Sequence, residues 1–288
     1  MEISVLITLF NREQYIEPCI RSAFASDFES FEVIVLDDQS TDGSYEKVLS
    51  LQKEFPRLRV YRNDTNLGQF GNRNAIVALA KGKYVKFIDS DDLLYPHTLR
   101  TMYWCLSQHP EAGAGIQDPF SKSLKQYPVF LKPKELFHYN FFTSNVFLGG
   151  PSSSLIKREV FEEFGGYQTE LLLEDNLFWV RVGEKYPLVL MPSCLVYWRQ
   201  HGGQEFSKWG EVKHNIHYLY FGLFTLYKAQ PFLTTKEYQQ VQKQLNNWLL
   251  GKMVQSIKMM KLITGVQWFV HGVLKRANYK KKYGIIAR

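Results

Sequence analysis

The sequence predicts an α/β fold in which a mostly parallel sheet flanked by helices is followed by a C-terminal helical extension. Residues 3–9 and 31–36 are nearly continuous runs of β-branched and apolar residues, which is typical of strands buried on both faces. Such runs alternate with helical patterns across short connections, and this alternation favours an open parallel sheet with helices on both faces. Beyond residue 211 the pattern is helical and rich in aromatic residues.

The expected elements can be placed in order along the chain. In the first half they are a strand at 3–9, a helix at 13–25, a strand at 31–36, a helix from the turn at 40–43 to about residue 55, a strand at 58–61, a helix at 72–80 and a strand at 83–88. From about residue 110 the alternation weakens, and the expected elements are a strand at 152–156, helices at 158–164 and 174–184, and a strand at 188–196. We therefore expect one domain over residues 1–210 and an extension over 211–288.

Positive charge is concentrated at the C-terminal end. The net charge is +7, but from Tyr238 onward the chain has ten Lys or Arg and no acid, whereas 25 basic residues precede it together with all 28 acidic ones. Such a basic tail suits a polyanionic neighbour, either nucleic acid or an anionic membrane surface. No nucleic-acid recognition motif is present in the sequence, so we expect no nucleic-acid partner.

The cysteines and the apolar segments indicate the compartment. Cys19, Cys105 and Cys194 lie far apart and form no C-x-x-C pair, so neither a disulfide framework nor a thiolate zinc site is expected. Reduced thiols are typical of the cytosol. The longest apolar stretch outside the core pattern, at 216–227, is too short and too interrupted to span a bilayer. We expect a cytoplasmic protein that is soluble or peripheral on the inner face of the membrane.

Three carboxylates follow the predicted strand at 83–88. Asp89, Asp91 and Asp92 repel one another unless a cation or water offsets their charge. Carboxylate oxygens suit Mg²⁺ or Mn²⁺, which share their coordination with substrate phosphates. The alternative is a solvated helix cap, since Asp is favoured at helix N-termini. Three acids at the end of one buried strand favour the metal site.

A second acidic pair, Asp37 and Asp38, ends the strand at 31–36 and is expected at the same sheet edge. Asp38 is placed to face a nucleotide, whereas Asp37 can equally form a turn with the residues that follow. Arg73 is expected at the start of the helix at 72–80, where it can pair with a phosphate or with Asp38. The alternative for Arg73 is a surface cation.

Two later positions can take part in chemistry. A reaction that transfers a group to a hydroxyl needs a base that takes the hydroxyl proton. Asp175, at the start of the helix at 174–184, can serve as such a base. From the residues alone, a helix cap is the better interpretation of Asp175. His201 follows a predicted strand and precedes glycines, so its imidazole can bind a metal. A structural or merely exposed histidine is the alternative.

Taken together, these segments resemble the family-2 glycosyltransferases, which have the Rossmann-like GT-A fold and invert the anomeric centre. The resemblance covers roughly residues 2–205. It rests on segments that occur in the family's order, namely Ser-Val-Leu-Ile-Thr-Leu-Phe-Asn-Arg at 4–12, Val-Leu-Asp-Asp-Gln-Ser-Thr-Asp-Gly-Ser at 35–44, Asn-Leu-Gly at 66–68 with Arg-Asn at 73–74, Phe-Ile-Asp-Ser-Asp-Asp at 87–92, Glu-Asp at 174–175 and Trp-Arg-Gln-His at 198–201. The resemblance implies a nucleotide-binding half at 1–110 and an acceptor half at 111–210.

The resemblance also implies roles for single residues in donor binding. Thr8 and Asp38 would contact the nucleobase, with Arg73 close by. Asp89 would approach the ribose, and Asp92 would support the site. The donor implied is a nucleotide-sugar, with UDP the expected nucleotide, and the acceptor is a glycan or lipid-linked glycan of the kind assembled on bacterial surfaces.

The remaining implied roles concern the metal and the base. Asp91 would hold Mn²⁺ or Mg²⁺ against the diphosphate, His201 would complete that site, and Asp175 would be the general base. The chain departs from the family pattern at Thr8-Leu9, where Pro followed by Thr or Ser is usual, at Gln39, where Gly is usual, and at Asn72, where a small Ala is common. None of these departures removes a catalytic group.

The alternatives to an active glycosyltransferase are an inactive nucleotide-sugar-binding protein and, less favoured, a phosphate-signalling receiver domain.

The C-terminal extension shows no such resemblance. Apolar residues including Leu245, Trp248 and Leu249 recur at helical spacing with lysines between them, and a second such stretch runs from Leu262 to Lys282. A basic amphipathic helix can lie on an anionic membrane surface. Alternatively, these helices pack their apolar face on the domain and leave the lysines in water.

Overall fold

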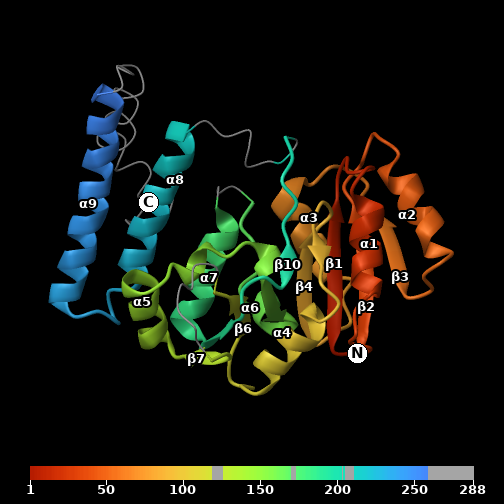
Figure 1. The fold of residues 1–288 in the computed structure, drawn as a ribbon, viewed down its shortest axis with the longest axis horizontal. Coiled ribbons are helices and arrows are strands. Elements are labelled where there is room, and N and C mark those ends of the chain that lie inside the picture. Colours follow the sequence, from red (N-terminus) through yellow and green to blue (C-terminus); the bar gives the residue numbers. More distant parts are fainter. Residues whose placement is uncertain (119–125, 170–172, 203, 205–210, 259–288) are drawn as a thin grey trace. The chain divides into compact units, whose positions relative to one another are not determined.

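The computed structural model describes residues 1–118, 126–169, 173–202, 204 and 211–258 (Figure 1). The strands are β1 Ile3–Leu9, β2 Phe31–Asp37, β3 Leu58–Arg62, β4 Tyr84–Asp89, β5 Leu93–Leu94, β6 Ala114–Gln117, β7 Val129–Leu131, β8 Ser154–Lys157, β9 Leu188–Met191 and β10 Val196–Tyr197. The helices are α1 Ile16–Phe24, α2 Ser44–Gln52, α3 Gly68–Val77, α4 Thr98–Ser107, α5 Pro133–Phe142, α6 Arg158–Glu163, α7 Glu174–Lys185, α8 Glu211–Lys228 and α9 Thr235–Lys258. The predicted α/β class is confirmed.

Eight of these strands form one sheet in the order β3-β2-β1-β4-β8-β6-β9-β7. β1 pairs in parallel with β2 and β4, β2 with β3, and β6 with β9. β8 runs antiparallel to β4 and β6, and β7 runs antiparallel to β9. The sheet is therefore mostly parallel, as predicted. β5 and β10 form a separate antiparallel pair.

The register of the central strands brings their carboxyl ends together. Thr8 of β1 lies opposite Leu36 of β2 on one side and opposite Asp89 of β4 on the other. Leu9 lies opposite Asp37, and the Asp38 N–H donates a hydrogen bond of 2.8 Å to the Leu9 carbonyl. The two acidic segments therefore lie on either side of the end of β1, at one sheet edge.

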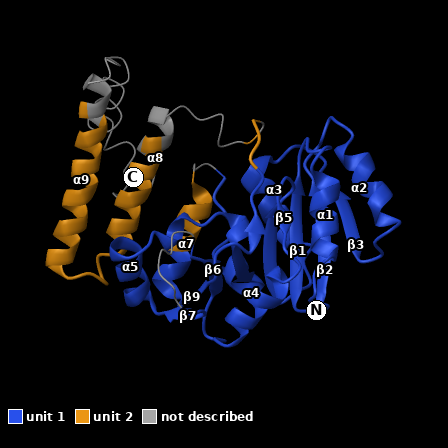
Figure 2. Cartoon of the chain, in the orientation of Figure 1, with its two compact units in different colours: residues 1–169, 181–199 blue, residues 170–180, 200–288 orange. Residues whose placement is uncertain are grey.

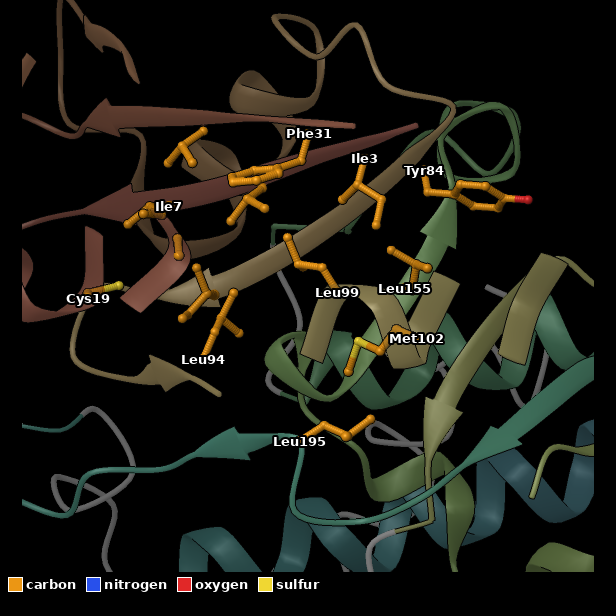
Figure 3. Close-up of a cluster of buried hydrophobic side chains, with 14 of the residues drawn as sticks. Ile3, Ile7, Cys19, Phe31, Tyr84, Leu94, Leu99, Met102, Leu155 and Leu195 are labelled. Atoms are coloured by element: carbon orange, nitrogen blue, oxygen red, sulfur yellow. The ribbon is translucent and has the colours of Figure 1, made fainter. Parts of the chain in front are cut away.

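Apolar side chains on one face of this sheet pack against α1 and α4. Figure 3 shows the cluster, which includes Ile3, Ile7, Phe31 and Tyr84 from the sheet, Cys19 from α1, and Leu99 and Met102 from α4. All of these side chains are at most 2% exposed. Burial of this kind gives roughly 25 cal/mol per Å² of apolar surface, so it holds the strands at a fixed register beneath the acidic edge.

Several predicted boundaries are wrong. The helix expected at 72–80 begins at Gly68, so Arg73 lies inside α3 and does not open it. The strand expected at 188–196 is two strands, because the chain turns between them and Cys194 has a left-handed φ of 62°. The strand expected at 152–156 begins at Ser154, after a 3-10 turn at Pro151–Ser153. The elements from β5 to α5 fall where the sequence predicted none.

The chain divides into two compact units (Figure 2). Unit 1 comprises residues 1–169 and 181–199, and unit 2 comprises residues 170–180 and 200–288. Unit 1 contains the sheet. Unit 2 contains the start of α7 and the α8–α9 hairpin.

The α8–α9 hairpin buries part of the apolar face predicted for the tail. A Cβ on Gly222 of α8 would lie 2.9 Å from Leu245 of α9, so the two helices approach closely there. Leu249 is 6% exposed, whereas Trp248 is 37% exposed. The second predicted stretch, from Leu262, falls outside the described residues. Among the helices that the structure describes, none combines the length and apolar character needed to cross a membrane.

Candidate active site

Asp37 forms the turn that follows β2. Its Oδ2 accepts a hydrogen bond of 3.1 Å from the Ser40 N–H and lies 3.2 Å from Arg62 Nε. Asp42 likewise accepts from the Ser44 N–H, at 3.0 Å, where α2 begins. The turn interpretation of Asp37 therefore holds, and Asp42 continues that turn to the first residue of α2.

Asp38 is 2% exposed and organises the start of α3. Its Oδ1 accepts hydrogen bonds from Asn63 Nδ2 at 2.7 Å and from the Leu67 N–H at 2.8 Å, and its Oδ2 accepts from the Gly68 N–H at 2.9 Å. A carboxylate offers about four acceptor positions, so room remains for one further donor, such as a base N–H. The predicted pairing of Asp38 with Arg73 does not occur in the structure.

Arg73 pairs with Asp89 instead. Its Nη2 donates to Asp89 Oδ1 at 2.5 Å, and its side chain is 3% exposed, so the surface-cation interpretation is wrong. The reason is the earlier start of α3, which places Arg73 in the second turn of the helix. The Asp89 side chain is 37% exposed and can still reach a ligand.

The other two acids of the cluster also have arginine partners. Arg12 Nε lies 3.0 Å from Asp91 Oδ2. Asp92 Oδ1 accepts from the Arg199 N–H at 3.2 Å, and the Arg199 guanidinium donates to the Asp91 main-chain carbonyl. Arg12, Arg73 and Arg199 come from three different segments. Each of the three carboxylates is therefore in contact with a different arginine.

The arginines do not fully offset the charge of the cluster. Burial, followed by the charges of Asp89 and Asp91, raises the pKa of Asp92 to about 8. A raised carboxyl pKa means that the anionic form is disfavoured, and a divalent cation would relieve that penalty. Hard oxygen donors in this environment fit Mg²⁺ or Mn²⁺. Among the described residues, no three His, Cys, Asp or Glu side chains gather as metal ligands. A metal held through Asp91 would therefore need oxygens from water and phosphate.

Six of the eight predicted site residues belong to unit 1 and lie at the edge formed by β1, β2 and β4. They are Thr8, Asp38, Arg73, Asp89, Asp91 and Asp92. Asp175 and His201 belong to unit 2, and their roles remain predictions. Asp175 lies in the first turn of α7, and its charge contributes, after burial, to the raised pKa of Tyr218. The His201 N–H donates to Gln204 Oε1 at 3.2 Å.

Arg12 and Arg199 were not among the predicted site residues. Both lie within segments that carry the family resemblance, 4–12 and 198–201. The available signals were that Arg12 lies three residues after the end of a strand and that Arg199 lies two residues before a candidate ligand. The pairing of each arginine with a carboxylate 79 or 107 residues away is a property of the fold.

Comparison with known proteins identifies the family of the chain. The model described as Glycosyl transferase family 2 matches residues 4–165. The chain is 36% identical over 102 residues to the GalNAc(5)-diNAcBac-PP-undecaprenol beta-1,3-glucosyltransferase of Campylobacter jejuni, a match that covers 35% of this chain and 33% of that protein. The chain thus spans about a third of that relative's length.

Two solved structures share the fold. S. aureus TarS 1–349 in complex with UDP-GlcNAc matches with a TM-score of 0.70 and 20% identity, covering 94% of this chain and 79% of that one. The mannosyltransferase PcManGT from Pyrobaculum calidifontis, in complex with GDP-Man and Mn²⁺, matches with a TM-score of 0.61 and 16% identity, covering 96% and 87%. The family model confirms the resemblance, and these structures confirm the GT-A fold predicted from the sequence.

Proposed function

Because the chain belongs to glycosyl transferase family 2, we propose that it is a metal-dependent, inverting enzyme that moves a sugar from a nucleotide-sugar to a hydroxyl of a glycan or lipid-linked glycan. The observation that carries this proposal is the acidic edge of unit 1, where Asp38, Arg73 and the cluster at 89–92 lie beyond the ends of parallel strands. Open α/β sheets bind ligands at this edge.

The donor side of the proposal uses residues of unit 1. Thr8 and Asp38 contact the nucleobase, with Arg73 close by, and Asp89 approaches the ribose with its exposed side chain. Asp92 supports the site through its contact with the Arg199 backbone. UDP is the expected nucleotide, and the UDP and UDP-GlcNAc complexes of TarS support this choice.

Asp91 of unit 1 holds the metal, Mn²⁺ or Mg²⁺, and His201 stays the second metal ligand predicted from the sequence. Bound there, the metal would offset the negative charge that develops on the leaving diphosphate, a large contribution in reactions of this kind. Support comes from the raised pKa of Asp92, which burial and then the charges of Asp89 and Asp91 cause, and from the Mn²⁺ bound by PcManGT.

Asp175 acts as the general base in this scheme. Its carboxylate takes the proton of the acceptor hydroxyl as that oxygen bonds to the anomeric carbon, and the bond from the same carbon to the diphosphate oxygen breaks on the opposite face. One displacement of this kind inverts the anomeric configuration. A screen of candidate acceptors would identify the acceptor and the linkage formed. Bacterial surface polysaccharide is the first class of acceptor to test.

We further propose that the protein works in the cytoplasm at the inner face of the membrane. The Campylobacter relative is named for an acceptor linked to undecaprenol, which is a lipid. On α9, Leu250 and Val254 are 56% and 49% exposed, and Lys252 Nζ lies 5.9 Å from the centre of the Trp248 ring. Exposed apolar and basic side chains on one helix suit an anionic membrane surface.

The test of the donor proposal is a screen of nucleotide-sugars for Mn²⁺-dependent thermal stabilisation, because a ligand that binds the folded state raises its melting temperature. We expect UDP-sugars to stabilise the wild type and not Asp91→Ala. Transfer to a glycan acceptor then distinguishes an enzyme from an inactive binding protein. If no nucleotide-sugar stabilises the wild type with Mn²⁺, or if Asp91→Ala retains full transfer, the proposal is wrong.

A further inference from the structure

The turn after β1 is built to aim Arg12 at the acidic cluster. Asn11 has a left-handed φ of 51°, a conformation that is uncommon outside glycine, and it turns the chain just before Arg12. The Ser40 hydroxyl accepts from the Asn11 N–H at 3.0 Å, and the Thr41 N–H donates to Asn11 Oδ1 at 2.8 Å. The Ser44 hydroxyl accepts from the Arg12 N–H at 2.8 Å. The backbone of Arg12 is therefore fixed by the segment that follows β2.

The side chain of Arg12 forms an ion pair with Asp91, the carboxylate that is expected to hold the metal. Its Nε lies 3.0 Å from Asp91 Oδ2, and the Asp91 side chain is 11% exposed. A guanidinium and a divalent cation on one partly buried carboxylate repel each other strongly, because screening by water is weak there. Metal binding at Asp91 must therefore displace Arg12 or act against its charge.

Arg12 is better suited to such an exchange than the other two arginines. Its side chain is 23% exposed, compared with 3% for Arg73, which is enclosed beside Asp89. The Arg199 guanidinium donates to the main-chain carbonyls of Asp91 and Tyr15, the second at 3.0 Å, so this side chain is held by the backbone and not by a carboxylate. Arg12 combines a fixed backbone with a side chain that reaches solvent.

We propose that Arg12 neutralises Asp91 in the absence of donor and leaves it for the donor diphosphate when the metal binds. This inference rests on the proposed metal role of Asp91. Its consequence is thermodynamic coupling: the metal alone competes with Arg12, whereas metal and nucleotide together give the guanidinium a new anionic partner. Arginine suits this role because its fork of N–H donors matches both carboxylate and phosphate. Metal and nucleotide therefore bind weakly apart and tightly together.

The test is Mn²⁺ affinity, measured by calorimetry without and with saturating UDP, which has no sugar to transfer. In Arg12→Met we expect Mn²⁺ alone to bind about fivefold or more tightly than in the wild type, the lower end of the range for coupled sites. UDP should strengthen Mn²⁺ binding less in Arg12→Met than in the wild type. Arg12→Lys, which keeps the charge without the fork, should keep Mn²⁺ binding weak and still reduce the effect of UDP.

Arg21→Met is the matched control. Arg21 pairs with Glu17 and Glu54 on the surface of the same unit, so this variant removes one positive charge away from the edge. It should leave both Mn²⁺ affinities unchanged. If Arg12→Met, folded by circular dichroism, binds Mn²⁺ alone no more tightly than the wild type, or keeps the full effect of UDP, the role of Arg12 is wrong. If Asp91→Ala binds Mn²⁺ in the presence of UDP as tightly as the wild type does, the proposed metal role of Asp91 is wrong, and the role of Arg12 that rests on it is wrong as well.

Discussion

Lys86 lies inside β4, and its side chain is completely buried. Strand alternation puts it on the same face as Tyr84 and Ile88, which belong to the apolar core. Its Nζ donates a hydrogen bond to the Ser152 carbonyl, and the Ser152 hydroxyl accepts from the Asp89 N–H at 3.1 Å. Lys86 thus fastens the turn at Pro151–Ser153 to the end of the strand that carries the acidic cluster.

Burial lowers the pKa of Lys86 from 10.5 to about 7. Between these two values the unfolded chain binds more protons than the folded one, so this group makes the protein more stable as pH rises through that window. Lys86→Met removes the effect. The free energy of unfolding of the wild type, relative to that of Lys86→Met, should therefore rise between pH 7 and pH 9, by at most about 1.4 kcal/mol per pH unit.

Urea unfolding of both proteins at the two pH values measures this difference. A difference that stays constant with pH would mean that Lys86 keeps an ordinary pKa in the folded state. The burial of this lysine could not be predicted from the sequence, because one Lys in a run of apolar strand residues fits an exposed edge equally well. Its burial follows from the pairing of β4 with β8, which lies about 70 residues further along the chain.

Among the elements, α3 depends most on a distant side chain. Asp38 accepts from the N–H groups of Leu67 and Gly68, which begin a helix that has no side-chain cap of its own at Leu67. Amide groups at a helix start need such partners. The acid at the end of β2 therefore takes the place of a local cap.

We expect Asp38→Ala to lower the free energy of unfolding by about 2–3 kcal/mol, because buried donors lose a charged acceptor. Asp42→Ala is the control, since Asp42 accepts from the N–H groups of Glu13 and Ser44, neither of which belongs to α3; it should cost about 1 kcal/mol. UDP stabilisation should be lost in Asp38→Ala and kept in Asp42→Ala. Equal losses of stability in the two variants would show that Asp38 does not organise α3.

The elements that the sequence predicted best are those with one clear pattern. β1, β2 and β4 are nearly continuous runs of apolar residues, and such runs leave few alternatives. β6 was missed because it has four residues and includes Gly115, which breaks the apolar pattern. The structure explains that glycine, since a Cβ on it would lie 2.8 Å from Met191 Sδ on β9. A close contact between residues of two strands does not change the hydrophobic pattern of either strand, so the sequence does not predict it.

At the scale of the whole molecule, the sequence predicted that the candidate donor residues lie at one sheet edge, where the structure has them, but it did not predict their partners. Strand order alone puts Asp38 and the cluster at 89–92 together, because parallel strands end on the same side. The pairing of Arg73 with Asp89, and of Arg12 with Asp91, depends on where α3 begins and on a left-handed Asn11. Those are local conformations that residue type only weakly dictates.

Donor binding and transfer should be separable by mutation, because the predicted donor residues belong to unit 1 and Asp175 belongs to unit 2. Asp175→Asn keeps the size of the side chain and removes its ability to take a proton. We expect this variant to keep the Mn²⁺-dependent stabilisation by a UDP-sugar within the error of the wild type. Its kcat for transfer should fall roughly 10²–10⁴-fold, the range for loss of a general base.

Measuring both quantities on the same samples identifies which role fails. Asp91→Ala should show the opposite profile, with stabilisation lost along with transfer, because the metal contributes to donor binding as well as to the reaction. An Asp175→Asn variant that retained wild-type kcat would remove Asp175 as the base, while the donor site of unit 1 would stand. If Asp175→Asn instead lost donor stabilisation, Asp175 would belong to the binding of the nucleotide-sugar and not to proton transfer.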